Sequence, residues 1–210
     1  MTKQRYNTEI VQSLIPFLKD NSIVCTMQNG LPEVSVAEVI GKDRTAGCTM
    51  SWGATFHGNG MSELTSEAER ETLTFNIGKY GNNDESLFSY IVELLHTMGN
   101  VTIEENFIGA RWSKLLINAA FSGLSVVTGE NFGKIAQNRT SRKLALEAIK
   151  ECIDVAEASH IVIEPIQGKD VVKLMNYNNL FKKRISLLIL PIAMKKHKLI
   201  KSSMLRDLKL

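Results

Sequence analysis

Apolar residues recur along the chain with two different spacings, and the change between them divides the sequence. In the first half, a segment with helical spacing over 9–18 leads into the short β-prone run Ile23–Met27, and such alternation continues to residue 104. Beyond that point nearly every segment has helical spacing. Alternating strands and helices are typical of an α/β sheet, whereas sustained helical spacing is typical of an all-α domain. The pattern therefore predicts an α/β domain over 1–104 and a helical domain over 105–210, with a cleft between them.

The same pattern places the expected elements in both halves. In the first half we expect helices over 9–18, 34–40 and 85–98 and extended segments over 23–27, 45–55, 72–77 and 101–103. In the second half we expect helices over 112–122, 139–159 and 170–208. Gly58-Asn59-Gly60 is expected as a turn between extended segments of one sheet, and Pro191 is expected to break or kink the last helix.

Two turns are candidates for ligand contact in the first half. Gln28-Asn29-Gly30 follows the first predicted strand, and open α/β sheets bind their ligands at the carboxyl ends of strands, so Asn29 is well placed for contact. The stretch Gly58–Glu63 partly matches a glycine-rich dinucleotide fingerprint, but it lacks the third glycine and opens no convincing helix. We therefore interpret it as a turn and expect the chain to lack a phosphate-binding loop.

A polar stripe interrupts the apolar helix predicted in the second half. Lys114, Asn118 and Ser122 stand at i, i+4 and i+8, so at about 100° per residue they share one face and drift only about 40° per step. One interpretation is structural, because a lysine can extend to solvent and a serine can bond back to the preceding turn. The other is the wall of a ligand-lined cleft, because a mostly apolar helix needs water or a ligand beside its polar groups.

Composition and charge limit the class of protein. With 210 residues, 44% of them hydrophobic and 22% charged, the chain has the balance of an ordinary globular protein. The net charge is +3, and basic residues gather near the C-terminus in 182–184 and 195–198, a cluster that could bind an anion. No nucleic-acid-binding signature accompanies this cluster, so no nucleic-acid partner is expected.

Other features bear on the cellular compartment. The apolar run 185–194 is too short to span a bilayer, and the N-terminus does not resemble a secretory signal, so we expect no membrane association. The cysteines Cys25, Cys48 and Cys152 are odd in number and widely spaced, which predicts neither a disulfide framework nor a metal site. A cytoplasmic protein is expected.

Three motifs, in this order, resemble the ketopantoate reductases, also called 2-dehydropantoate 2-reductases. They are Met27-Gln28-Asn29-Gly30, then Trp112-Ser113-Lys114-Leu115 with Asn118, and finally Ser202-Ser203-Met204-Leu205-Arg206-Asp207. The resemblance runs through essentially the whole chain. It implies a Rossmann-like domain that holds NADPH, followed by a helical domain of the 6-phosphogluconate dehydrogenase C-terminal-like type. The implied activity is the reduction of 2-dehydropantoate, or a similar 2-keto acid, to the 2-hydroxy acid, as in pantothenate biosynthesis.

The resemblance also implies roles for individual residues. Lys114 corresponds to the catalytic lysine that polarises and protonates the keto oxygen while the nicotinamide delivers hydride. Asn118 corresponds to a substrate-binding asparagine, and Ser203 to a serine that contacts the substrate carboxylate. Asn29 matches an asparagine near cofactor and substrate, and Lys3 a lysine near the cofactor phosphates. No metal enters this chemistry.

The chain departs from the family pattern at three places. Ser122 stands where a second asparagine is usual, so we expect either a different keto acid or a water that bridges the shorter side chain to the substrate. We expect the first strands of the Rossmann domain and a substrate-binding glutamate beyond residue 210 to be missing. Two hypotheses remain open: part of an NADPH-dependent reductase, or a catalytically silent helical module for dimerisation or binding. A homodimer is compatible with both.

Overall fold

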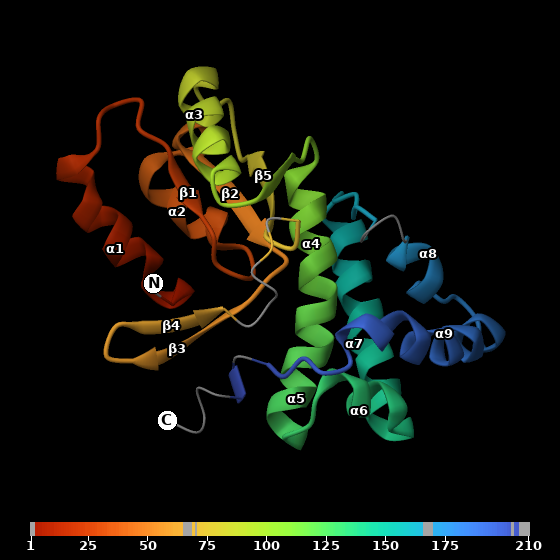
Figure 1. Ribbon diagram of the computed structural model, residues 1–210. Helices are drawn as coiled ribbons and strands as arrows, with labels where there is room; N and C mark the ends of the chain where they lie inside the picture. The colour runs from red at the N-terminus through yellow and green to blue at the C-terminus, as the bar shows by residue number, and fades with distance from the viewer. Residues whose placement is uncertain (1–2, 65–68, 70, 166–169, 203, 206–210) are drawn as a thin grey trace. The chain divides into compact units, whose positions relative to one another are not determined.

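The computed structural model describes residues 3–64, 69, 71–165, 170–202 and 204–205. The chain forms two compact units, Met1–Phe107 and Ile108–Leu210, whereas the sequence pattern placed the boundary after residue 104. The first unit is a mixed α/β unit, and the second consists of helices (Figure 1). Within the described ranges, none of the helices combines the length and the apolar character that a membrane crossing requires.

The first unit is built on a four-stranded sheet in the order β1-β2-β5-β6. Its elements are η1 (Gln4–Tyr6), α1 (Asn7–Leu14), η2 (Ile15–Phe17), β1 (Val24–Thr26), α2 (Pro32–Ile40), η3 (Lys42–Arg44), β2 (Thr45–Met50), β3 (Ala54–Gly58), β4 (Met61–Leu64), β5 (Thr74–Lys79), α3 (Glu85–His96) and β6 (Asn100–Ile103). Strands β1 and β2 are parallel, as are β5 and β6, and β2 runs antiparallel to β5. Each parallel pair is joined through a helix, α2 or α3, as parallel connections require.

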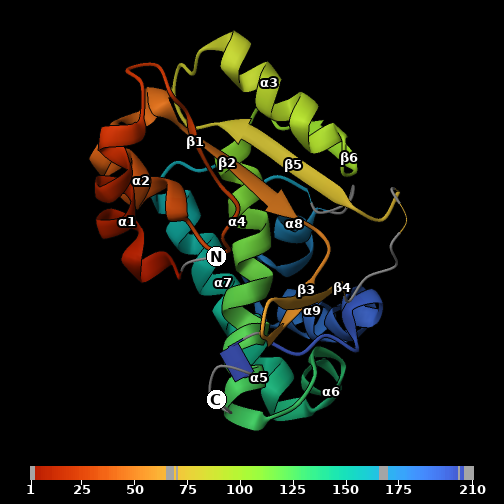
Figure 2. The same cartoon turned by 60° about the vertical axis from the view of Figure 1, so that its left-hand side comes forward.

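Side chains alternate between the two faces of this sheet. Ala46 and Cys48 of β2 and Ile77 of β5 point to the face that α3 covers, where they form an apolar cluster with Phe88. Figure 2 shows α3 lying along this side of the strands. The alternation follows directly from the period of two in a β-strand, and it fixes which residues remain for the other face.

The opposite face of the sheet depends on two glycines. Gly47 of β2 and Gly78 of β5 are register partners, and a Cβ atom at either position would collide with the ring of Phe107. At Gly47 it would also collide with the carboxylate of Glu33 in α2, which accepts a hydrogen bond from the Thr26 hydroxyl. The missing side chains therefore let an aromatic ring and a helix approach the strands closely.

The expected turn at residues 58–60 belongs to a different structure from the one predicted. Strands β3 and β4 pair with each other in a separate two-stranded sheet, so this turn does not join two strands of the main sheet. Gly58, Asn59 and Gly60 have φ values of 84°, 51° and 78°, which explains the two glycines. Because a strand follows the turn, this stretch is a hairpin turn, which agrees with its rejection as a phosphate loop.

The second unit packs its helices around α7. Its elements are α4 (Phe107–Ile117), η4 (Asn118–Ser122), α5 (Gly123–Thr128), α6 (Phe132–Gln137), α7 (Arg139–Ala158), α8 (Val171–Met175), α9 (Leu180–Ala193) and η5 (Met194–His197). Asn138 caps α7, because its side-chain oxygen accepts hydrogen bonds from the backbone N–H groups of Thr140 and Ser141 at 3.0 Å. Ile149 and Ile153 of α7 are fully buried in the core of this unit.

The single helix expected over 170–208 is wrong, because the described part of this segment forms two α-helices. The segment forms α8 and α9 with a break between them, where Asn179 caps α9 by accepting from the N–H of Lys182 at 2.8 Å. Pro191 lies inside α9, and the helix continues to Ala193 before a 3-10 turn. In the last turn, a proline removes one helical hydrogen bond without ending the helix at once.

Gly47→Ala tests the close approach at the sheet. We expect a loss of about 1–3 kcal/mol in the free energy of unfolding, because the added methyl group must displace Glu33 or Phe107. The matched control is Gly123→Ala, where nothing lies within 4 Å of the new Cβ and the helical position should gain ~0.5–1 kcal/mol. Chemical denaturation measures both, and equal stabilities would contradict this packing.

Candidate active site

The polar stripe predicted in the helical unit lies on one helical run from Phe107 to Thr128. Lys114 is in α4, whereas Asn118 and Ser122 are the first and last residues of η4. The side chains of Lys114 and Asn118 are half-buried, and Ser122 is 8% exposed. The structure therefore brings these three candidates together on a single element, each withdrawn in part from solvent.

The helix differs from the regular α-helix that was predicted. Residues Asn118–Ser122 form a π-helical turn between α4 and α5. Hydrogen bonds from i to i+5 make such a turn longer than 3.6 residues, and Asn118 and Ser122, four residues apart, still lie on the same side of the helix. Single π turns occur frequently at functional sites.

The remaining side chains of this helix anchor it in the core. Leu116, Ala120 and Phe121 are at most 1% exposed and belong to the cluster formed with α7. The ring of Phe121 packs at 41° against that of Phe132, with centroids 5.4 Å apart. These contacts fix the rotation of the helix about its axis, and the rotation determines where the polar stripe points.

Ser113, next to the candidate lysine, has a structural role that the sequence did not reveal. It is 5% exposed, and its hydroxyl is shared between the carbonyl oxygen of Gly109, at 2.9 Å, and that of Glu164. The second contact ties α4 to the segment that follows α7. A serine in an apolar helix indicates a hydrogen bond from its hydroxyl to a backbone carbonyl. The local sequence does not indicate a partner as distant as Glu164.

Ser202, the first residue of the third sequence motif, lies beside α5. Ser202 is 4% exposed, and its N–H donates to the hydroxyl oxygen of Ser125 at 3.3 Å. The Ser125 hydroxyl in turn donates to the carbonyl of Glu130 at 2.7 Å. Ser125 comes one helical turn after Ser122, so this bond holds Ser202 to the same helical run. Ser203 itself lies outside the described residues.

The two cofactor candidates belong to the α/β unit, on segments that contact each other. Asn29 is exposed in the turn after β1, and Lys3 is exposed immediately before η1. Gly30 has a φ of 84°, and a Cβ there would lie 2.9 Å from Oε1 of Gln4, the residue after Lys3. The turn of Asn29 and the segment of Lys3 are therefore packed against each other.

A second polar cluster links α7 to the region of α8 and α9. The carboxylate of Glu147 forms an ion pair with Lys183 and accepts a hydrogen bond from the Tyr177 hydroxyl. The Lys183 hydrogen bond lowers the pKa of Glu147, whereas burial, together with the bond to Glu147, raises the pKa of Tyr177. The Lys183 ammonium also lies 4.9 Å from the centroid of the Tyr177 ring. This cluster fastens α9 to the core.

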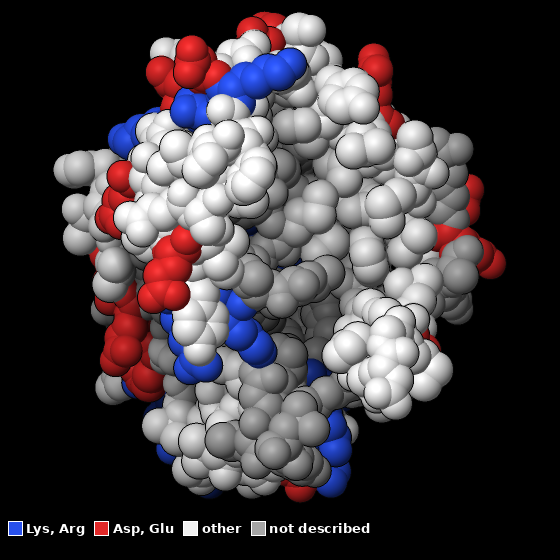
Figure 3. Space-filling view, turned by 90° about the vertical axis from the view of Figure 1, so that its left-hand side faces the viewer, with Lys and Arg blue, Asp and Glu red and all other residues white. Residues whose placement is uncertain are grey.

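Charges of both signs occur on one face of the molecule. On the face that Figure 3 shows, acidic and basic side chains lie interspersed among uncharged ones. This fits the small net charge of +3. The field at this face is therefore mixed in sign.

Comparison with known proteins first gives the class of fold. The structure matches D-mandelate dehydrogenase, solved in complex with NADH, with a TM-score of 0.76 and 16% identity, covering 100% of this chain and 64% of that one. It also matches a dimeric ketopantoate reductase from Staphylococcus aureus, with a TM-score of 0.67 and 16% identity, covering 100% and 62% of the two chains. These likenesses establish a Rossmann-like α/β unit followed by a helical unit.

Sequence comparison then gives the family. Residues 1–78 match the model of ketopantoate reductase PanE/ApbA, and residues 106–209 match that of its C-terminal domain. The chain belongs to the ketopantoate reductase family. It is 24% identical over 157 residues to the 2-dehydropantoate 2-reductase of Pyrococcus horikoshii, a match that covers 74% of this chain and 50% of that protein. The chain thus spans about half the length of this relative.

Ser125→Ala tests the docking of Ser202. Loss of the hydroxyl leaves the Ser202 N–H and the Glu130 carbonyl without this partner, so we expect the free energy of unfolding to fall by about 1–3 kcal/mol. We also expect the Ser202 amide to exchange its hydrogen faster. The control Ser13→Ala removes an exposed hydroxyl and should change stability by less than about 0.5 kcal/mol. Unchanged exchange at Ser202 would contradict the assignment.

Proposed function

We propose that this chain functions in a nicotinamide-dependent reductase. The reaction is the reduction of a 2-keto acid similar to 2-dehydropantoate to the 2-hydroxy acid. The observation that carries this proposal is the alignment of Lys114, Asn118 and Ser122 across a π turn of an otherwise buried helix. Family membership supports it, since the relative from Pyrococcus horikoshii is a 2-dehydropantoate 2-reductase.

Lys114 is the proposed proton donor. Reduction of a ketone places negative charge on its oxygen, and an ammonium group stabilises that charge and supplies the proton. Lys114 is half-buried, so the surrounding protein limits the water that would otherwise weaken this interaction. The cofactor, when bound, supplies the hydride for the carbonyl carbon.

Asn118 and Ser122 are the proposed substrate contacts. The Asn118 amide can donate to a carboxylate and accept from a hydroxyl, while the Ser122 hydroxyl is a shorter group that leaves more room. The proposed substrates therefore include keto acids with a larger or differently branched side chain. The likeness to D-mandelate dehydrogenase makes aryl 2-keto acids worth testing beside 2-dehydropantoate.

The residues of the α/β unit fit a nicotinamide dinucleotide. Asn29 offers an amide at the carboxyl end of β1, and Lys3 offers an ammonium suited to a phosphate. Gly30 gives the turn the left-handed conformation that brings backbone close to a ligand. Family resemblance favours NADPH, whereas the D-mandelate dehydrogenase structure contains NADH, so both cofactors belong in the assay.

A second candidate function is self-association through α9. Phe181, Leu188 and Ile192 are 74%, 71% and 72% exposed, and with Ile185 they recur at spacings of four, three and four residues. Leu190, on the opposite face of α9, is buried in the core. A helix that is apolar on both faces is stable when both are covered, and this spacing is that of a helix-pairing seam. We propose that a second copy of the chain packs against this exposed apolar face of α9.

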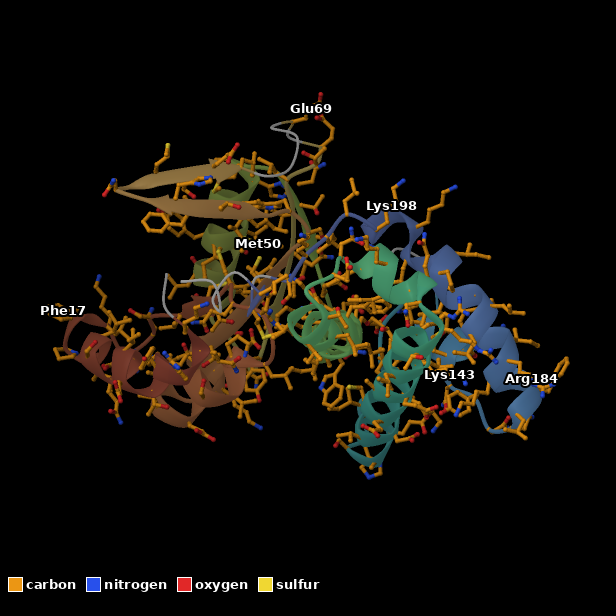
Figure 4. All side chains as sticks on the ribbon, turned by 90° about the horizontal axis from the view of Figure 1, so that it is seen from below. Phe17, Met50, Glu69, Lys143, Arg184 and Lys198 are labelled. Atoms are coloured by element: carbon orange, nitrogen blue, oxygen red, sulfur yellow. The ribbon has the colours of Figure 1, made fainter. Side chains whose placement is uncertain are left out.

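Charge and homology favour a second copy as that partner. Arg184 and Lys198 project outward from α9 and the segment after it, as Figure 4 shows. Helix α7 of the same unit exposes the acidic residue Glu151, so a second copy offers opposite charge to these cations. The Staphylococcus aureus relative is described as dimeric.

Lys114→Ala tests the proposed reductase. In an assay of NADPH or NADH oxidation with 2-keto acids, we expect kcat to fall by about 10²–10⁴-fold, because the proton donor acts in the transition state. Ser122→Ala removes one neutral hydrogen-bonding group and should lower kcat/KM by about tenfold or less. Lys143→Ala, on exposed α7 surface, is the control. Equal losses for Lys114→Ala and Ser122→Ala would remove Lys114 from this role.

Leu188→Glu tests the proposed dimer. A carboxylate in the centre of the apolar seam should raise the dimer dissociation constant by about tenfold or more, which sedimentation velocity would measure. The matched control is Phe17→Glu, because Phe17 is 84% exposed in the α/β unit (Figure 4). A wild-type chain that stays monomeric at high concentration, or a Leu188→Glu variant that dimerises normally, would overturn the proposal.

A further inference from the structure

A partly buried amide pair joins the two segments that carry the cofactor candidates. Asn7 is 5% exposed, and its Nδ2 donates to Oε1 of Gln28 at 2.9 Å. The Nε2 of Gln28 donates back to Oδ1 of Asn7, also at 2.9 Å. Nδ2 of Asn7 makes a further bond to Oγ of Ser35 at 3.2 Å. One side chain thus connects the first residue of α1, the turn after β1, and α2.

The pair is close to saturated in hydrogen bonds. Asn7 has two donor hydrogens and two acceptor lone pairs, and three of these four are used by Gln28 and Ser35. The Ser35 hydroxyl donates a hydrogen bond to the Pro32 carbonyl oxygen at 3.0 Å. A partly buried network of this kind allows one arrangement of the participating segments, because any other leaves a polar group without a partner.

This arrangement fixes both sides of the exposed candidate Asn29. On one side, Gln28 is held by Asn7. On the other, Gly30 lies in the left-handed region with the Gln4 side chain against it. Gln4 follows Lys3 directly in the sequence. The same contacts therefore hold the backbone of Asn29 and the backbone that carries Lys3.

We propose that Asn7 is a positioning residue for the nicotinamide dinucleotide. Its amide pair with Gln28 holds the turn of residues 28–30 in the shape that presents Asn29 and the Lys3 segment to the cofactor together. This role rests on the proposed reductase function. Stability alone does not require an amide here, because an apolar pair of similar size can replace a buried hydrogen-bonded pair at little cost. The amide pair specifies one shape of the turn.

The experiment compares Asn7→Leu with the exchanged pair Asn7→Gln/Gln28→Asn. We expect Asn7→Leu to raise the dissociation constant for NADPH and NADH, measured by fluorescence titration, by about tenfold or more. Turnover at saturating cofactor should change by about twofold or less, because Asn7 does not act on the substrate. The exchanged pair keeps both amides and their summed length, so it should recover most of the affinity.

A second readout follows the turn in the absence of cofactor. We expect Asn7→Leu to shift the NMR resonances of the Asn29 and Gly30 amides, because their backbone changes position, while the strands of the sheet keep their protection from hydrogen exchange. The control Gln12→Leu removes an exposed amide from the same helix and should alter neither these resonances nor affinity. Uniformly faster exchange throughout the α/β unit would show a merely structural role and overturn the inference.

The possible failures can be told apart. Because the chain is expected to lack a phosphate-binding loop, weak binding of the wild-type chain agrees with the proposed function. A wild-type chain that binds neither NADPH nor NADH at millimolar cofactor would contradict that function, and the positioning role with it. Wild-type binding that Asn7→Leu leaves unchanged would contradict the role of Asn7 alone. Loss of affinity that the exchanged pair does not restore would show that the hydrogen-bonded pair is not what holds the turn.

Discussion

The burial of one face of the helical run from Phe107 to Thr128 is the constraint on which the candidate site depends. Leu116 and Phe121 are fully buried against the α7 core, so the helix cannot rotate without exposing them. Fully burying side chains of this size contributes about 1.5–3 kcal/mol each, so their exposure would be costly. The direction of the polar stripe is therefore set by apolar contacts on the far side of the helix. Packing therefore holds the side chains of the polar stripe in position.

Much of the fold could be predicted because its signals are local. The β1 strand, helix α7 and the turn at Gly30 follow from short-range hydrophobic period and from one glycine. The resemblance to the family rests on motifs of a few residues each, and the family models match 1–78 and 106–209. For the candidate site, the common face of the stripe could also be predicted, since it needs only helical geometry.

The rest could not be predicted because it depends on partners far apart in the sequence. The hydroxyls of Ser113 and Ser125 bond to residues 51 and 77 positions away, and no local pattern indicates these partners. The same holds for Asn7, whose partner Gln28 is 21 residues distant. Gly47 and Gly78 become necessary only when the sheet register brings them together under Phe107. The π turn is a local feature, but helical period describes only the α-helix.

Buried polar groups recur at the supports of the candidate residues. Ser113 and Ser125 hold the helix of Lys114 and the segment of Ser202, and Asn7 holds the turn of Asn29. Such groups add little net stability, because each gives up hydrogen bonds to water, but a wrong arrangement leaves them unpaired at a cost of about 1–3 kcal/mol. They therefore discriminate between alternative packings more strongly than apolar contacts of the same size do. A site that must present donors to a substrate and a cofactor needs this discrimination more than it needs added stability.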